Sequence, residues 1–179
     1  MTRIINLALL ILQVLLGLFA IALAAPVVEA TLVEVIPGPG MPSLASLNLT
    51  SAQLYAMDPL SHGLDARGAN IEEKCFNFDL APRTQVSACK SYLTALGKTM
   101  CGVHAPAGVH GFYQAFCQAG KAMIYGANWG PTDFAGSYCS DVALAIGYLL
   151  RDCGANGGDI AGQIAANGNG ALLVSVVGV

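Results

Sequence analysis

The sequence has few charged residues and no excess of basic ones. Only 11% of its 179 residues are charged, and eight Lys and Arg against eleven Asp and Glu give a formal net charge of −3. Nucleic-acid-binding proteins carry a basic face, and proteins that bind anionic membranes carry clusters of Lys and Arg. The composition therefore argues against nucleic acid as a partner and against a polybasic membrane binder.

Short motifs that mark metal or catalytic sites are also missing. The cysteines form no C-x-x-C pair, whereas zinc ligands in structural sites are normally two to four residues apart. There is no G-x-S-x-G elbow for a serine nucleophile. The six glycines between positions 154 and 170 lack the following Lys-Ser/Thr of a phosphate-binding loop. We expect no metal, no cofactor and no catalytic residue.

One long apolar run is present, at the start of the chain. Residues 4–25 contain no charge, follow Arg3, and end in small residues including Ala24 and Ala25. This layout predicts a signal peptide over residues 1–25, with an uncleaved anchor as the alternative. Removing it would change the net charge from −3 to −4. No later run reaches about 18 apolar residues, so we expect a secreted protein without a membrane span after signal removal.

Six cysteines come after the apolar run. An even count in a secreted chain indicates three disulfides, for which fifteen pairings exist. Fourteen helical positions separate Cys139 from Cys153 and span about 21 Å, whereas a disulfide needs Cα atoms within about 7 Å. These two cysteines cannot pair with each other if both lie on one helix. The set is Cys75, Cys89, Cys101, Cys117, Cys139 and Cys153.

Residues 26–70 differ in composition from the cysteine-containing part of the chain. They are rich in Pro, Gly and Ser, contain no cysteine and show no sustained period. We expect a flexible leader or propeptide here, ahead of a disulfide-stapled domain over residues 71–179. The segment contains one N-glycosylation sequon, at Asn48.

Two segments of the domain have the apolar spacing of amphipathic helices. The first is expected to begin at Thr84 as N-cap and to end at Gly97. The second is expected to begin at Ser137 as N-cap and to end at Gly154. The predicted buried stripes are Val86, Cys89, Leu93 and Leu96 in the first helix, and Val142, Ile146, Leu149, Leu150 and Cys153 in the second.

Short strands occupy much of the remainder. In one expected strand, Phe76 and Phe78 alternate with polar residues and so lie on one side. Two hairpins are expected, one connected by residues 118–121 and the other by Asn-Gly-Asn-Gly at 167–170. Residues 101–111 and 126–137 are expected to be a loop and a turn-rich connection. The predicted order is β-α-β-β-α-β-β, an α+β domain with two helices packed on one face of a mostly antiparallel sheet and stabilised by disulfides.

The stretches "AFCQAGKAMIYG" (115–126) and "GSYCSDVALAIGYLLRDCGANGGDIAGQIAANG" (136–168) resemble small secreted fungal proteins of the killer-toxin-like and necrosis-inducing effector group. The resemblance covers roughly residues 75–178. It implies a killer-toxin-like α/β sandwich and a secreted fungal effector or antagonistic toxin that is not an enzyme. It transfers no individual functional residue to this chain.

Two small groups of residues are candidates for function. Trp129, with Asn128 and Asp133 on the same turn, could stack on a sugar or anchor in a partner's pocket, although we expect a lone tryptophan in a small domain to be partly buried. His104 and His110 could bind a metal or form a hydrolytic site with Asp133 or Asp141, but their spacing matches no metal motif, and we expect ordinary loop histidines.

These features leave three classes of function. The first is a secreted effector or toxin-like protein that binds a host or competitor target, whether a protein, a membrane component or a glycan. The second is a small secreted hydrolase or glycan-processing enzyme, which would need a pocket with a histidine beside a carboxylate. The third is a structural cell-wall or surface protein, which would self-associate. The cysteine pattern and the lack of catalytic motifs favour the first.

Overall fold

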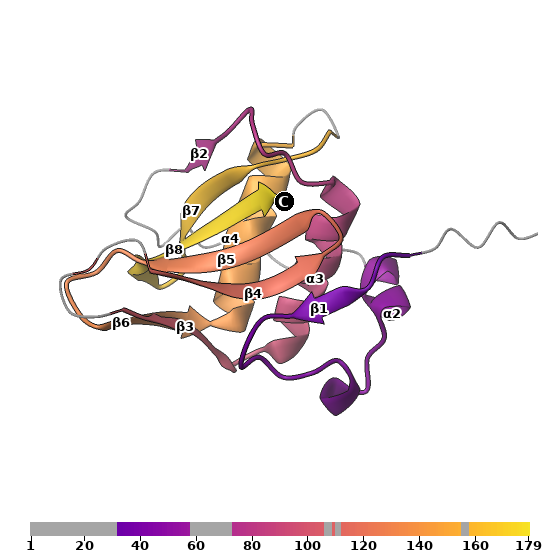
Figure 1. The fold of residues 1–179 in the computed structure, drawn as a ribbon, viewed down its shortest axis with the longest axis horizontal. Helices are drawn as coiled ribbons and strands as arrows, with labels where there is room; N and C mark the ends of the chain where they lie inside the picture. Colours follow the sequence, from indigo (N-terminus) through magenta and orange to yellow (C-terminus); the bar gives the residue numbers. More distant parts are fainter. Residues whose placement is uncertain (1–31, 58–72, 106–108, 110–111, 155–157) are drawn as a thin grey trace, which may run out of the picture. The chain divides into compact units, whose positions relative to one another are not determined.

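The centre of the molecule is an antiparallel six-stranded sheet (Figure 1). The computed structural model describes residues 32–57, 73–105, 109, 112–154 and 158–179, so the predicted signal peptide lies outside it. Leu32–Val179 form one unit. In sheet order the strands are β1 (Val35–Pro37), β4 (Tyr113–Ala119), β5 (Ala122–Asn128), β8 (Asn169–Gly178), β7 (Gly162–Ala166) and β2 (Lys74–Cys75).

Two long helices, α3 (Arg83–Leu96) and α4 (Cys139–Asp152), cover one face of this sheet. The predicted α+β class and the packing of two helices on a mostly antiparallel sheet are thereby confirmed. Both predicted apolar stripes are buried, except that Cys153 is only half-buried. The two predicted hairpins are β4–β5 and β7–β8, whose turns are Gly120-Lys121 and Asn167-Gly168.

The two predicted helix starts are wrong by two residues and by one residue. The N-cap of α3 is Pro82 rather than Thr84, and the N-cap of α4 is Tyr138, without a side-chain cap. Ser137 belongs to a strand, where its hydroxyl donates to the carbonyl of Asn167 at 2.9 Å. Gly97 ends α3 as predicted, with a positive φ of 55°.

The segments expected to be a loop and a turn-rich connection contain two further strands. β3 (Met100–His104) and β6 (Phe134–Tyr138) pair as a separate two-stranded antiparallel sheet. Gly102 and Gly136 interrupt the alternation of side chains, and the ring of Phe134 lies over both glycines. The strand expected within residues 73–80 does not include the two phenylalanines, since β2 ends at Cys75 and the Phe76 and Phe78 rings stack at 5.3 Å beyond it.

The segment expected to be a flexible leader is folded over residues 32–57. It contains β1, a 3-10 helix η1 (Ala45–Leu47) and α2 (Ser51–Ala56). β1 pairs with β4, and α2 packs on α3 with Leu54 fully buried. The expected flexibility is wrong for residues 32–57, because their contacts are long-range and leave no period in the sequence. That the segment is a propeptide stays a prediction, and the rest of residues 26–70 lies outside the described residues.

Three disulfides join the helices to the strands. Cys89–Cys117 ties α3 to β4, Cys101–Cys139 ties β3 to the start of α4, and Cys75–Cys153 ties β2 to the end of α4. This confirms that all six cysteines are paired and that Cys139 and Cys153 have different partners. The two ends of α4 are each fixed to a strand.

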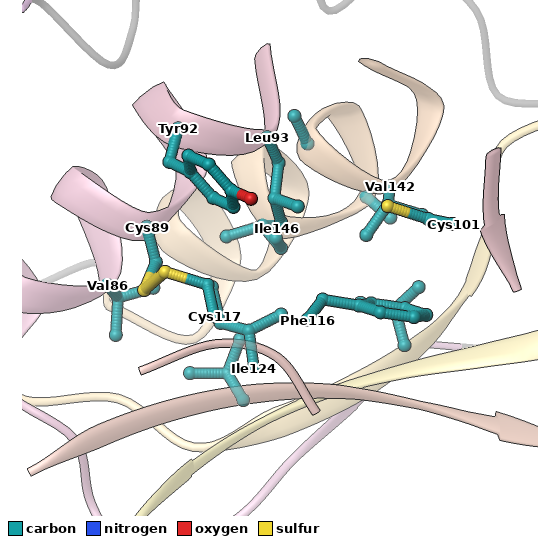
Figure 2. Packing of buried hydrophobic residues seen from close by; sticks show 14 of the residues in the cluster. Val86, Cys89, Tyr92, Leu93, Cys101, Phe116, Cys117, Ile124, Val142 and Ile146 are labelled. Atoms are coloured by element: carbon teal, nitrogen blue, oxygen red, sulfur yellow. A yellow bond between two sulfur atoms is a disulfide. The ribbon is translucent and has the colours of Figure 1, made fainter. Parts of the chain in front are cut away.

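The core lies between the helices and the sheet, around the Cys89–Cys117 disulfide (Figure 2). Leu93 and Ile146 from the helices point toward Phe116 and Ile124 of the sheet, and all four side chains are fully buried. Among the described residues, no helix is both long and apolar enough to cross a membrane.

Candidate functional site

Exposed aromatic rings gather where the two strands of the β4–β5 hairpin end. Phe112, Tyr113 and Trp129 are 47%, 71% and 56% exposed. Main-chain pairing places their backbones close together, because Tyr113 is opposite Ala127 and the amide of Asn128 donates to the carbonyl of Phe112 at 3.2 Å. We call this group, together with Tyr125, the aromatic end.

Asn128 holds the turn that carries Trp129. Its amide nitrogen donates to the carbonyl of Thr132 at 2.9 Å, and its Oδ1 accepts from the amide of Gly130 at 2.8 Å. The amide of Trp129 donates to the carbonyl of Ala171 at 2.9 Å, which fixes the start of the turn against β8. These bonds set the backbone from which the indole projects.

This geometry corrects two expectations. Trp129 was expected to be partly buried against its hairpin, but it is exposed because it follows the last paired residue of β5. Asn128 was a candidate partner contact, but its side chain is 1% exposed and its amide hydrogen-bonds within the turn. Asp133 is exposed, as a contact residue must be, and its carbonyl accepts from the amide of Ala105 at 2.8 Å.

Tyr113 and Tyr125 form the second part of the aromatic end. Tyr125 is opposite Ala115, two residues along from Tyr113, so both side chains lie on the same face of the sheet. Their ring centroids are 5.6 Å apart with the planes tilted by 59°, a separation within the range of favourable aromatic pairs. Tyr125 thus supports the more exposed Tyr113 ring.

The aromatic end lies in a sparsely charged part of the domain. Between Lys98 and Asp133 the only charged residue is Lys121. Lys121 lies in the turn that closes the hairpin, at the other end of β4 and β5. Asp133 is therefore the one charged side chain of the two connections at this end, residues 105–112 and 129–133.

Sequence analysis did not identify Phe112 and Tyr113 as site residues, because their pattern indicates only the start of a strand. The run of uncharged residues around them was the signal that could have identified them.

A second exposed apolar group lies on the outer face of β3 and β6. Met100 pairs with Tyr138 and His104 pairs with Phe134, and all four side chains are exposed. The His104 and Phe134 rings are 4.6 Å apart. His104 therefore packs on an aromatic ring, and His110 lies outside the described residues.

A cleft of about 450 Å³ lies beside α2 and the start of α3. The hydroxyl of Tyr55 is buried there without a hydrogen-bond partner among the described residues, and burial raises the pKa of Tyr55. Arg83, on the wall, donates to the carbonyls of Leu150 and Gly154 at 2.7 and 2.9 Å. The described lining contains no histidine or carboxylate; it is Leu32, Tyr55, Met57, Arg83, Thr84 and Ser87.

Two further candidates are a group of possible metal ligands and the N-glycosylation sequon. Within the described residues, one group of three side chains has the spacing of metal ligands, Glu73, Cys75 and Cys153. Its two sulfur atoms are joined in a disulfide, so they are not thiolate ligands. The sequon residue Asn48 is exposed at the end of η1, with a left-handed φ of 53°.

Comparisons with known proteins give one family assignment. No curated protein and no solved structure matches the sequence. A family model for a domain of unknown function, DUF8794, matches residues 70–178, which is more than half of the chain. The chain belongs to this DUF8794 family.

Proposed function

We propose that this protein is a secreted effector or toxin-like binding protein that contacts a host or competitor target through its aromatic end. The observation that carries the proposal is that Phe112, Tyr113 and Trp129 are all exposed and that their backbones are adjacent at one end of a sheet. Tyrosine and tryptophan supply large contact areas at low entropic cost and dominate the energetics of many interfaces. A small extracellular domain would rarely leave such rings exposed without use.

The rigidity of the surroundings supports the same interpretation. β4, which carries Tyr113, is tied to α3 by Cys89–Cys117, and the turn before β6 is held by the buried Asn128 amide. A surface held in one conformation loses little entropy when a partner binds. The aromatic end therefore suits binding by surface contact.

The hydrolase alternative has weaker support. It requires a histidine beside a carboxylate in a pocket, whereas His104 packs on Phe134. The described residues that line the α2–α3 cleft include neither group. A binding function needs only groups that are on the surface.

The proposal is tested by applying the purified protein to leaf tissue and to cultures of competing fungi. Wild type should cause cell death or growth inhibition in at least one assay, and labelled protein should bind the sensitive cells. Tyr113→Ala should reduce binding by about tenfold, since removing one well-placed ring costs on the order of 1–2 kcal/mol. Tyr138→Ala, which removes an exposed tyrosine from β6, is the matched control and should bind as wild type does.

Two results would contradict the proposal. One is toxicity or cell binding that is equal in Tyr113→Ala and wild type. The other is hydrolysis of a substrate in a panel of glycans, esters and peptides by protein that binds no cell.

A further inference from the structure

We propose that the ligand of the aromatic end is a neutral polysaccharide. This inference rests on the function proposed above, in that it takes the aromatic end as the contact surface and adds the chemical class of the partner. Its support comes from the rings, from the polar groups beside them and from the scarcity of charge around them.

The rings provide the apolar part of a sugar site. A hexose unit has one face made of C–H groups and an edge made of hydroxyls, and the C–H face packs well on an aromatic ring. Tyr113, the most exposed of these rings, packs against the tilted ring of Tyr125, with 5.6 Å between the ring centroids. Trp129 projects from the neighbouring connection and is 56% exposed. Several rings at one end suit consecutive units of a chain better than a single sugar.

The polar groups at this end suit hydroxyl partners. Tyrosine and tryptophan each combine an apolar body with a hydrogen-bonding tip. Asp133 adds one exposed carboxylate on the same connection as Trp129, and a carboxylate accepts hydrogen bonds from hydroxyl groups. Such a site offers stacking surfaces and a few polar tips, which is the composition expected of a site for uncharged ligands.

The charge distribution disfavours other ligands. An anionic polysaccharide, a phosphate or an anionic lipid surface would be bound by Lys or Arg. Lys121 is the only Lys or Arg between Lys98 and Arg151, and it lies at the closed end of the hairpin. Among the described residues of this end, Asp133 is the one carboxylate that a cationic ligand would meet. A neutral ligand is the one that this end can bind without an unpaired charge.

The test uses purified, oxidised full-length protein and three insoluble neutral polysaccharides, namely cellulose, chitin and β-1,3-glucan. Wild type should bind at least one of them in a sedimentation assay. Trp129 is the only tryptophan in the chain, so its fluorescence should shift when a soluble hexasaccharide of the bound polymer is added. Raising the ionic strength about tenfold should leave the affinity unchanged, since no ion pair contributes.

The variants assign the binding to the site. Tyr113→Ala should weaken binding by about tenfold, and Tyr138→Ala should leave it unchanged. Near-ultraviolet circular dichroism verifies that each variant is folded. Tyr113→Leu keeps the apolar bulk of the side chain but removes the ring, and it should also bind weakly. Binding to none of the three polymers, or equal binding by Tyr113→Ala, would overturn the inference.

The outcome separates this inference from the broader proposal. If labelled protein binds cells in a Tyr113-dependent way but binds no polysaccharide, the glycan assignment is wrong and the binding function stands. Vesicles of phosphatidylcholine and protease-treated cells then distinguish a lipid from a protein partner. If neither cells nor polymers are bound, both proposals fail.

Discussion

Tyr92 shows how one residue joins the N-terminal segment to the helical layer. It is fully buried on α3, and its hydroxyl donates to the carbonyl of Pro42 at 2.6 Å. Burial raises the pKa of Tyr92 to about 12, because the phenolate would lose its hydration. The folded state therefore keeps this proton at a pH where the unfolded chain releases it.

We predict that stability falls in alkali because of Tyr92. The neutral phenol contributes to the free energy of unfolding, and this contribution is fully present below pH 10. It is lost between pH 10 and about pH 12, which lowers the free energy of unfolding by about 3 kcal/mol. Tyr92→Phe removes the hydrogen bond and should lower the free energy of unfolding by about 1 kcal/mol at neutral pH. The stability of this variant should also fall less steeply in alkali than that of wild type. Urea unfolding across this pH range measures both effects. Tyr138→Phe is the control, and an unchanged decline in Tyr92→Phe would contradict the assignment.

Gly126 illustrates a glycine that the packing requires. A Cβ at this position would lie 2.6 Å from the ring of Phe116 and 2.9 Å from Leu172, and both side chains are fully buried. Neither can move aside without disturbing the core, so Gly126→Ala should destabilise the fold by about 1–3 kcal/mol. Gly158→Ala, where a Cβ would meet nothing within 4 Å, should be nearly neutral in the same urea titration.

Residue types alone indicated the chemistry of the candidate site but not its orientation. Trp129 and Asn128 are neighbours in sequence, yet one is 56% exposed and the other 1% exposed. The difference arises because Asn128 is the last residue of β5 and faces inward. A sequence does not reveal where a strand ends to within one residue, and one residue decides which side chain faces solvent.

At the scale of elements, α4 is held by two disulfides of different accessibility. Cys101 and Cys139 are fully buried, whereas Cys75 is exposed and Cys153 half-buried. A reductant must reach a sulfur atom to attack it. The bond at the end of α4 is therefore the accessible one.

We predict that Cys75–Cys153 is reduced before the other two disulfides. Partial reduction followed by alkylation and peptide mass spectrometry should find Cys75 and Cys153 labelled first. The double variant Cys75→Ser, Cys153→Ser should retain the fold at a cost of about 2–4 kcal/mol. Earlier labelling of Cys89 or Cys101 would show that burial does not set the order.

Elements with a clear apolar period were predictable, and those with long-range partners were not. Both helices and both hairpins follow from apolar spacing and turn residues. β3 and β6 were missed because Gly102 and Gly136 break the alternation, and the ring that covers them comes from Phe134. β1 was missed because it is three residues long and is defined by pairing with β4, far along the chain.

At the scale of the whole molecule, the folded unit begins at Leu32 rather than near residue 71. Val35 and Leu54 contribute fully buried side chains to the core. Burying each is worth about 1.5–3 kcal/mol, against a net stability of about 5–15 kcal/mol for a typical domain.

We predict that a shortened chain beginning at residue 71 is much less stable than one beginning at Leu32. The loss should reach about 3–6 kcal/mol, from the two side chains alone. Thermal and urea unfolding of both chains, each with its disulfides formed, provide the measurement. Leu54→Ala in the full chain should reproduce about 2–5 kcal/mol of the loss. Equal stability of the two chains would restore the interpretation of this segment as a dispensable leader.

The attachment of α4 at both ends has a consequence for how the protein is degraded. Helices usually open from their termini, and a frayed turn is where a protease first gains an extended substrate. Here the first residue of α4 and the residue after its last turn are both covalently held to strands. Cleavage within α4 therefore requires the helix to open while both ends stay attached, so proteases should cut the exposed connections before they cut this helix.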